Sequence, residues 1–207
     1  MSRDEDALTV PGGWSAYYDT PITTAPHPTL TVALDAFDAE TATGPLVAVD
    51  LGCGQGRDSL ELLRRGWRVL AIDSDPDGVA RLRRQAGRDH GGRLEVRLGR
   101  FEDERWPAAD LVNASLTLGW CAADEFARLW DRVVRSLRPG GRFAGQLFGD
   151  RDRGGGFPTT TRLSRREVDV LLAGWDVEFF REESVDSMTP FGVPKHRHLY
   201  DVVARRR

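Results

Sequence analysis

Three glycines stand within five residues, at Gly52, Gly54 and Gly56, between an apolar run that ends at Leu51 and a segment with helical spacing. A glycine-rich turn between a strand and a helix presents backbone N–H groups, and the missing side chains let a ligand approach the main chain closely. A dinucleotide loop follows the pattern G-x-G-x-x-G, which requires a third glycine where this sequence has Arg57. The spacing therefore favours a nucleotide-type ligand other than a dinucleotide.

Two acidic residues accompany this loop. Asp50 stands two positions before the first glycine, and Asp73 ends the next apolar run, 21 residues after Gly52. A carboxylate at Asp50 repels phosphate and attracts an ammonium group, whereas an acid in the position of Asp73 accepts hydrogen bonds from the hydroxyls of a ribose. An ammonium group and a ribose in one ligand indicate S-adenosylmethionine.

Strands and helices alternate along the chain. Apolar runs predict seven strands, over residues 46–51, 67–72, 94–98, 110–116, 142–148, 175–180 and 198–203. Helical spacing and capping signals predict helices that begin near Leu30, Ser59, Asp75, Phe126 and Ser164. Pro139-Gly140-Gly141 is predicted to be a turn. This order predicts an α/β fold with a mostly parallel sheet and an antiparallel end, in which the glycine loop lies at the carboxyl ends of the strands, where ligands bind.

Five segments resemble, in order and spacing, the motifs of class I S-adenosylmethionine-dependent methyltransferases: VAVDLGCGQGRDSL, VLAIDSDP, GRFED, DLVNAS and LRPGGRFAGQLFG. This likeness covers residues 45 to 150. The segments DLGCGQGRDSL, GFP, GWDVEFF and VVARRR extend it to most of the chain, because they resemble the small bacterial tellurite-resistance type and its uncharacterised relatives. The resemblance implies a Rossmann-like, seven-stranded, mostly parallel sheet with an antiparallel C-terminal strand and helices on both faces.

The resemblance also implies which residues meet the methionine part and the ribose. Asp50 and Gly52 serve the amino end of the methionine part, and Arg57 serves its carboxylate or the loop geometry. Asp73 binds the ribose. Asn113 meets the cofactor near the reacting sulfonium, through its backbone or its amide.

The adenine contacts follow from the same resemblance. Ser74 lies at the adenine rim, and Phe101 and Glu102 flank the ring. Arg100 departs from the pattern, because many relatives carry an acid or a small residue just before this aromatic residue. The expected cofactor-binding set is Asp50, Gly52, Gly54, Gly56, Arg57, Asp73, Ser74, Phe101, Glu102 and Asn113.

The candidates for contact with the methyl acceptor are Tyr18 and His196. Tyr18 belongs to an aromatic group in the N-terminal arm that either anchors the arm on the sheet or lines the acceptor pocket. His196 and His198 alternate on the last predicted strand and therefore face one side, which offers a general base if the acceptor is protonated at working pH. A metal site needs more ligands, and the sequence has no further histidine or cysteine cluster, so no metal is expected.

The tellurite-resistance type carries a polar His-Arg pair before its last strand, and this sequence has no counterpart around Ser184 to Met188. This difference argues against tellurite as the acceptor.

Composition sets the broad class. The chain has 207 residues, of which 40% are hydrophobic and 29% are charged, which is typical of a globular protein with one core. Its 29 basic and 32 acidic residues are interspersed, which argues against nucleic acid as a partner. The acidic start MSRDEDALTV has no apolar signal region, no apolar run approaches membrane-spanning length, and two cysteines make no disulfide framework. We expect a bacterial cytoplasmic protein.

The whole chain, residues 1–207, is predicted to form one methyltransferase domain. Residues 1–44 are the arm and helix that cover the site, residues 45–150 are the cofactor-binding core, and residues 151–207 form the acceptor side. The expected reaction moves a methyl group from S-adenosylmethionine to a small-molecule acceptor by in-line displacement and leaves S-adenosylhomocysteine. Two alternatives stay open: an enzyme of the same fold that acts at another carbon of the sulfonium, for example by cyclising the aminobutyrate arm with release of methylthioadenosine, and a cofactor-sensing binding module.

Overall fold

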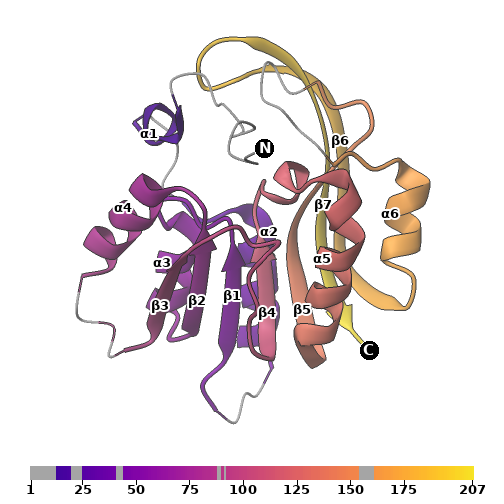
Figure 1. The fold of residues 1–207 in the computed structure, drawn as a ribbon. Coiled ribbons are helices and arrows are strands. Elements are labelled where there is room, and N and C mark those ends of the chain that lie inside the picture. The colour runs from indigo at the N-terminus through magenta and orange to yellow at the C-terminus, as the bar shows by residue number, and fades with distance from the viewer. Residues whose placement is uncertain (1–12, 20–24, 41–43, 88–89, 91, 154–160) are drawn as a thin grey trace.

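A computed structural model describes residues 13–19, 25–40, 44–87, 90, 92–153 and 161–207. Seven strands form one sheet in the spatial order β3-β2-β1-β4-β5-β7-β6 (Figure 1). Their bounds are β1 Val47–Leu51, β2 Arg68–Asp73, β3 Leu94–Leu98, β4 Ala109–Ala114, β5 Leu137–Phe148, β6 Trp175–Met188 and β7 Pro194–Arg206. Strands β1 to β5 are parallel, and β7 runs antiparallel to both of its neighbours, β5 and β6. The mostly parallel sheet with an antiparallel end is therefore confirmed.

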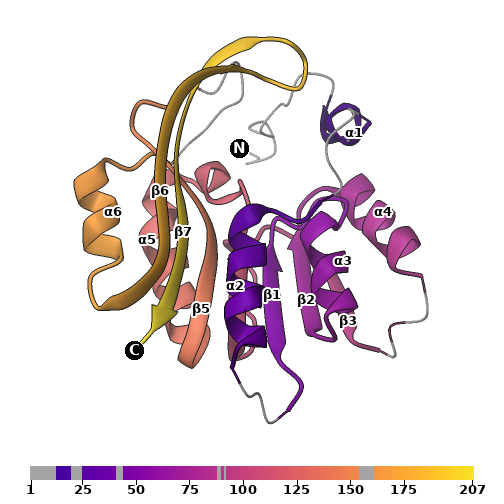
Figure 2. The same cartoon turned by 180° about the vertical axis from the view of Figure 1, so that it is seen from behind.

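Helices cover both faces of the sheet (Figures 1 and 2). Their bounds are α1 Gly13–Tyr18, α2 Pro28–Asp38, α3 Arg57–Arg64, α4 Pro76–Ala86, α5 Ala123–Ser136 and α6 Arg165–Leu171, with a short 3-10 helix η1 at Leu118–Trp120. Apolar side chains of α2, α3 and α4 form one core layer with the sheet, and those of α5 and α6 form the other. α1 lies beyond the carboxyl edge of the parallel strands, beside α4.

Local sequence signals explain where the helices begin. Asp75 caps α4 by accepting a 2.7 Å hydrogen bond from the backbone N–H of Gly78. Ser164 and Glu167 form the predicted capping box at the start of α6. α2 begins with Pro28, whose missing N–H costs nothing in a first turn.

The start of β5 differs from the prediction. Pro139-Gly140-Gly141 was predicted to be a turn, but β5 begins at Leu137 and runs through these residues. The pairing with β4 shifts here, because Ala109 pairs with Leu137 whereas Leu111 pairs with Arg142. A bulge therefore absorbs the residues that the sequence marks as a turn.

The last two strands are much longer than predicted. The predicted ranges 175–180 and 198–203 cover only their inner halves. Beyond the carboxyl edge of the sheet, β6 and β7 pair with each other as far as Met188 and Pro194 and arch over that edge (Figures 1 and 2). These outer halves have no apolar face, so hydrophobic alternation does not reveal them.

The described helices include none that is long and apolar enough to cross a membrane.

Substitution of Leu34 by alanine tests how α2 is held on the sheet. Leu34 is fully buried, at 0% exposure, in the layer shared by α2, β5 and β7. We expect Leu34→Ala to lower the free energy of unfolding by about 2–5 kcal/mol, through lost burial and the cavity left behind. Asp35→Ala, on the exposed side of the same helix, should change it by less than about 0.5 kcal/mol. Urea unfolding measures both, and equal effects would contradict the packing of α2.

Candidate functional site

The glycine loop joins β1 to α3 at the carboxyl edge of the parallel strands. Gly52, Gly54 and Gly56 have left-handed backbone, with φ of 68°, 51° and 96°. This conformation is strained for residues with a side chain, so the shape of the loop itself requires glycine. α3 begins directly afterwards at Arg57.

Two of these glycines also leave room for neighbouring side chains. A Cβ atom on Gly52 would stand 1.8 Å from Oγ1 of Thr117. A Cβ atom on Gly54 would stand 3.3 Å from the ring of Tyr18. The loop is therefore lined by one residue that follows β4 and by one residue of α1.

Gly56, unlike Gly52 and Gly54, faces the hydrophobic core. A Cβ atom there would stand 2.3 Å from Cδ1 of Leu82, a core residue of α4. The absence of a side chain at Gly56 thus lets the loop pack on α4.

Asp50 lies beneath the glycine loop, with 2% of its surface exposed. Its Oδ2 accepts a 2.5 Å hydrogen bond from Oγ of Ser59, and its Oδ1 accepts a 2.9 Å hydrogen bond from Nδ2 of Asn113. Burial, followed by the nearby charge of Asp58, raises the pKa of Asp50 to about 7, and the two hydrogen bonds oppose this rise. Asp50 therefore changes between its protonated and its ionised form near neutral pH.

Asp58 forms a second buried carboxylate beside the first. It shares the amide of Asn113, whose Nδ2 lies 3.1 Å from Oδ2 of Asp58. Its other oxygen accepts hydrogen bonds from Nε of Arg57 at 3.1 Å and from the backbone N–H of His27 at 2.9 Å. Burial acts to raise the pKa of Asp58, but Arg57 and these hydrogen bonds outweigh it, so the pKa lies below its usual value.

Asp73 ends β2 and is tied to the glycine loop. Its Oδ2 accepts a 2.7 Å hydrogen bond from the backbone N–H of Gly54, and its Oδ1 accepts a 2.8 Å bond from that of Asp75. Burial raises the pKa of Asp73. The predicted ribose residue therefore stands directly beside the loop, and Ser74, its neighbour, is exposed.

Polar contacts hold α1 on α4. Oγ of Ser15 donates a 3.0 Å hydrogen bond to Asp77, and Arg81 forms ion pairs with Asp19 and Asp77, each at 2.8 Å. The guanidinium of Arg81 also lies 5.6 Å from the centre of the Tyr18 ring. α1 is thus fixed beside the glycine loop.

Tyr18 is buried, at 9% exposure, where α1 meets the loop. Its hydroxyl would lie 2.7 Å from a Cβ atom on Gly78, in the first turn of α4. Burial and then the charge of Asp73 raise the pKa of Tyr18, which keeps the hydroxyl protonated. The structure therefore brings Tyr18 to the predicted cofactor side, next to Gly54.

The predicted adenine residues lie after β3. Phe101 is buried, at 9% exposure, and belongs to the core layer of α5. The side chain of Glu102 is buried as well, and this burial raises its pKa. Nη1 of Arg132 holds the turn by donating hydrogen bonds to the carbonyl groups of Phe101, at 3.2 Å, and Glu102, at 3.0 Å.

The segment after β4 has a strained residue. Leu116 has a φ of 58°, and its backbone N–H donates a 2.9 Å hydrogen bond to Oε1 of Gln146 on β5. Gln146 is fully buried, and its Nε2 lies 3.1 Å from Oγ1 of Thr29, 3.0 Å from Oδ1 of Asp201 and 3.0 Å from Nδ1 of His27. One glutamine thus joins this segment to α2 and β7, which fixes the strained turn beside the glycine loop.

Sequence reasoning missed three of these polar residues: His27, Asp58 and Gln146. Only weak signals were present, since His27 lies between two prolines, Asp58 lies in a first helical turn, and Gln146 interrupts an apolar strand.

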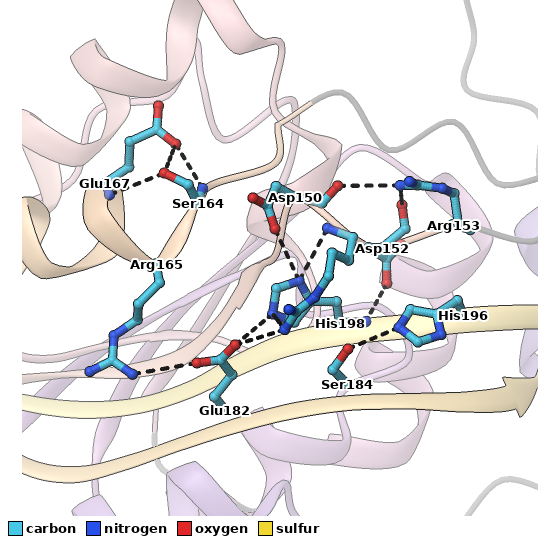
Figure 3. Close-up of polar contacts among 11 residues, drawn as sticks. Asp150, Asp152, Arg153, Ser164, Arg165, Glu167, Glu182, Ser184, His196 and His198 are labelled. Atoms are coloured by element: carbon cyan, nitrogen blue, oxygen red, sulfur yellow. Dashed lines mark hydrogen bonds and ion pairs between the residues drawn. The ribbon is translucent and has the colours of Figure 1, made fainter.

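His196, the other predicted acceptor residue, lies on the outer half of β7 (Figure 3). Its Nδ1 is 2.7 Å from Oδ1 of Asp186 and its Nε2 is 2.9 Å from Oγ of Ser184. His198 is buried, at 1% exposure, and its Nε2 is 3.1 Å from Oε1 of Glu182. No contact among the described residues joins His196 to the glycine loop or to Tyr18.

Within the described ranges, no group of three or more histidine, cysteine, aspartate or glutamate side chains is arranged to hold a metal ion.

The comparisons with known proteins agree with this geometry. Residues 48–141 match a family model described as a methyltransferase domain. A search of curated proteins found no match to the sequence. Among solved structures, TehB from Haemophilus influenzae is similar, with a TM-score of 0.74 and 18% identity over 94% of this chain and 66% of that chain.

Two other similar structures contain ligands. The 1,6-didemethyltoxoflavin-N1-methyltransferase of Burkholderia thailandensis, with bound 1,6-didemethyltoxoflavin and S-adenosylhomocysteine, has a TM-score of 0.66 and 22% identity over 94% of this chain and 82% of that chain. The magnesium protoporphyrin IX methyltransferase of Synechocystis, with bound S-adenosylmethionine, has a TM-score of 0.61 and 16% identity over 86% of this chain and 76% of that chain.

The sheet order, the crossing helices and the glycine loop at the carboxyl edge define a Rossmann-like methyltransferase fold. Together with the match of residues 48–141 to a methyltransferase-domain model, this fold makes the chain similar to the class I S-adenosylmethionine-dependent methyltransferases, and it resembles the TehB type. The two similar methyltransferases with ligands hold S-adenosylmethionine or its product S-adenosylhomocysteine.

The charges around the loop fit this cofactor. Asp50, Asp58 and Asp73 place three carboxylates there, and among the described residues only Arg57 has a cationic group within 4.0 Å of any of them. A ligand with an ammonium and a sulfonium group compensates this excess of negative charge, whereas a diphosphate adds to it.

The pH dependence of cofactor binding tests the role of Asp50. A cationic ligand favours the ionised carboxylate, so binding should release the Asp50 proton and strengthen as pH rises from 6 to 8. We expect S-adenosylhomocysteine, which carries the ammonium group, to bind the unmodified protein about three- to tenfold more tightly at pH 8, as measured by calorimetry. Asp50→Asn should bind more weakly at pH 8 and lose most of this dependence, and the exposed control Asp35→Asn should keep it. Equal affinity of the unmodified protein at both pH values would contradict this role.

Proposed function

We propose that the chain transfers the methyl group of S-adenosylmethionine to a small-molecule acceptor. The observation that carries this proposal is the excess negative charge at the glycine loop, where Asp50, Asp58 and Asp73 are compensated by Arg57 alone among the described residues. A loop of bare backbone at the carboxyl edge of a parallel sheet is also the usual ligand position in such folds.

Residues from both ends of the loop would hold the cofactor. Gly52 and Gly54 would offer backbone carbonyl groups to the methionine part, since their N–H groups already donate to Ile72 and Asp73. Asp50 would compensate the ammonium group from beneath. Asp73 would accept hydrogen bonds from the ribose hydroxyls while it remains anchored to the loop. Asn113 would contribute indirectly to cofactor binding, because its amide donates hydrogen bonds that position Asp50 and Asp58.

The remaining predicted cofactor residues are assigned to the adenine, the carboxylate and the loop. Ser74, Phe101 and Glu102 would border the adenine ring. Arg57 would meet the methionine carboxylate, and Gly56 would hold the loop against α4.

The bound sulfonium supplies an already activated methyl group, so the protein has to align an acceptor lone pair with it and keep water away. Positioning of this kind provides most of the rate enhancement in such transfers. Tyr18 would exclude water above the glycine loop, because its ring already lies against Gly54. His196 would take a proton from an acceptor that is protonated at working pH.

Two observations favour a small-molecule acceptor. The similar methyltransferase from Burkholderia holds 1,6-didemethyltoxoflavin, and the one from Synechocystis is named for magnesium protoporphyrin IX. The formal net charge of −3 comes from interspersed charges, which does not favour nucleic acid. We further propose a single domain, since the seven described strands join one sheet, with residues 151–207 on the acceptor side. A cytoplasmic location remains part of the proposal.

Analysis of the nucleoside product tests the reaction. Incubation with S-adenosylmethionine and a mixture of candidate small-molecule acceptors should yield S-adenosylhomocysteine, detected by chromatography. Release of methylthioadenosine would instead show reaction at another carbon. If calorimetry shows cofactor binding but no acceptor mixture consumes the cofactor, the chain is a binding module and the proposal fails.

Asp73→Asn tests the ribose contact. The substitution keeps the size of the side chain, removes the charge from the hydrogen bonds to ribose, and leaves only one of the two oxygens that accept from the backbone N–H groups of Gly54 and Asp75. We expect the affinity for S-adenosylhomocysteine to fall at least tenfold, which corresponds to about 1.4 kcal/mol, with little change in the circular dichroism spectrum. The control Asp103→Asn, which alters an exposed carboxylate, should bind normally. Unchanged binding by Asp73→Asn would contradict the assignment.

A further inference from the structure

The outer half of the β6–β7 hairpin carries a polar cluster that the proposed cofactor site does not use. Nδ1 of His196 lies 2.7 Å from Oδ1 of Asp186. Its Nε2 lies 2.9 Å from Oγ of Ser184 (Figure 3). Asp186 is the pairing partner of His196 across the two strands. The cluster is thus built on regular strand pairing, and 33% of the His196 side chain is exposed.

This arrangement orients the imidazole. A carboxylate accepts a hydrogen bond and cannot donate one when ionised, so Asp186 places the ring proton of neutral His196 on Nδ1. Nε2 is then the basic atom, and it points toward the hydroxyl of Ser184. A carboxylate that fixes the tautomer of a histidine in this way is the arrangement found in general-base catalysis.

A hollow of about 500 Å³ lies beside this cluster. It is lined by Arg153, Asp186, Ser187, Pro194, Lys195 and His196. The backbone N–H of Arg153 donates a 2.8 Å hydrogen bond to the carbonyl of His196, which joins the segment after β5 to the hairpin. The outer half of the β6–β7 hairpin, which carries most of the lining residues, lies beyond the carboxyl ends of the parallel strands, on the edge where the glycine loop lies (Figures 1 and 2).

The two cations that line this hollow, Arg153 and Lys195, have no ion-pair partner among the described residues, whereas other cations of the hairpin do. Arg181 is paired with Asp201 at 2.6 Å, and Arg197 is paired with Glu183. Among the described residues, Lys195 has no carboxylate within 4.0 Å, and the guanidinium of Arg153 donates only to backbone carbonyls, at 3.2 Å.

One further polar atom of the lining lacks a hydrogen-bond partner within the described part of the chain, the buried Oγ of Ser187. The buried carboxylate of Asp152, which is not part of the lining, lies close enough for its charge to act on Lys195. The negative groups that face Lys195 and His196 are thus Asp152 and Asp186, and Asp186 already serves His196. The hollow retains positive groups and hydrogen-bond donors that a small anion fits.

We propose that this hollow binds the methyl acceptor by an anionic group, carboxylate or phosphate, held by Arg153 and Lys195, while His196 takes the acceptor proton with Asp186 as its positioning residue. This inference rests on the proposed methyl transfer. The acceptor atom forms a bond to the methyl carbon as the carbon–sulfur bond breaks, the bonding electron pair stays on sulfur, and the acceptor proton passes to Nε2 of His196.

Binding of simple anions tests the hollow. Benzoate and inorganic phosphate are titrated into the full chain saturated with S-adenosylhomocysteine, and the histidine ring signals are followed by NMR, with the His196 signal assigned by His196→Gln. We expect benzoate or phosphate to shift the His196 signal, and the uncharged benzamide to leave it unchanged. Lys195→Met should weaken anion binding at least fivefold without altering affinity for S-adenosylhomocysteine. Arg135→Met, on the exposed side of α5, is the control and should bind as the unmodified protein does.

The tautomer of His196 tests the positioning role of Asp186. Nitrogen chemical shifts of the neutral ring should show the proton on Nδ1 in the unmodified protein. Asp186→Ala should move it largely to Nε2, and Asp186→Asn, which keeps an acceptor oxygen, should restore part of the original population. If Asp186 only stabilised the hairpin, the fraction of His196 protonated on Nδ1 would not fall in Asp186→Ala and partly recover in Asp186→Asn.

The outcomes separate this inference from the proposed function. Anions that leave the His196 signal unchanged, or that bind Lys195→Met equally well, overturn the acceptor site even if the chain makes S-adenosylhomocysteine. An unchanged tautomer in Asp186→Ala overturns the positioning role. Failure of the chain to bind S-adenosylhomocysteine at all overturns the proposed function, whatever binds in the hollow.

Discussion

The amide of Asn113 donates to two buried carboxylates at once, and this contact holds the site together. Asp50 comes from β1, Asp58 from α3 and Asn113 from β4. Two acids this close would repel each other without the shared donor and without Arg57 on the far side of Asp58. The glycine loop joins β1 to α3, so the hydrogen bonds of Asn113 stabilise both the conformation of the loop and the carboxylates beside it.

This support explains how a carboxylate with little exposed surface can still influence a ligand. Asp50 does not need to touch the cofactor, because burial makes its field stronger than it would be in water. In the proposed cofactor site, the loop above Asp50 would supply backbone contacts and Asp73 would supply hydrogen bonds to the ribose. Cofactor recognition would then combine these direct contacts with the charge of Asp50 beneath them.

Parts of the fold with a strong hydrophobic signal were predictable from the sequence. β1, β2 and β3 match their predicted ranges to within a residue or two. β1 and β2 are buried parallel strands with continuous apolar runs, whereas the edge strand β3 is recognised by its alternating apolar residues. The outer halves of β6 and β7 were not predictable, since runs such as REESVDSM have no apolar face. The turn prediction at Pro139-Gly140-Gly141 was wrong because a bulge accommodates the same residues within a strand.

Some residues of the candidate site could be predicted from the sequence and others could not. The positions of the glycines, Asp50 and Asp73 follow from motif spacing. His27, Asp58 and Gln146 carry no motif, and their importance arises only when α2, α3 and β5 converge. Tyr18 was considered for the acceptor side, yet its ring lies on the loop, because Arg81 and Ser15 fix the short α1 against α4.

The hairpin contains one irregularity with a consequence for everything beyond it. In β6, Val177 pairs with Ala204 and Phe179 pairs with Val203, so Glu178 is an extra residue in the ladder, and its carboxylate binds the buried Arg142. Were the ladder unbroken, every later side chain of β6 would change faces, and His196 would stand opposite Val185. One extra residue, whose carboxylate is paired with Arg142, therefore determines whether a carboxylate or an apolar side chain stands opposite that imidazole.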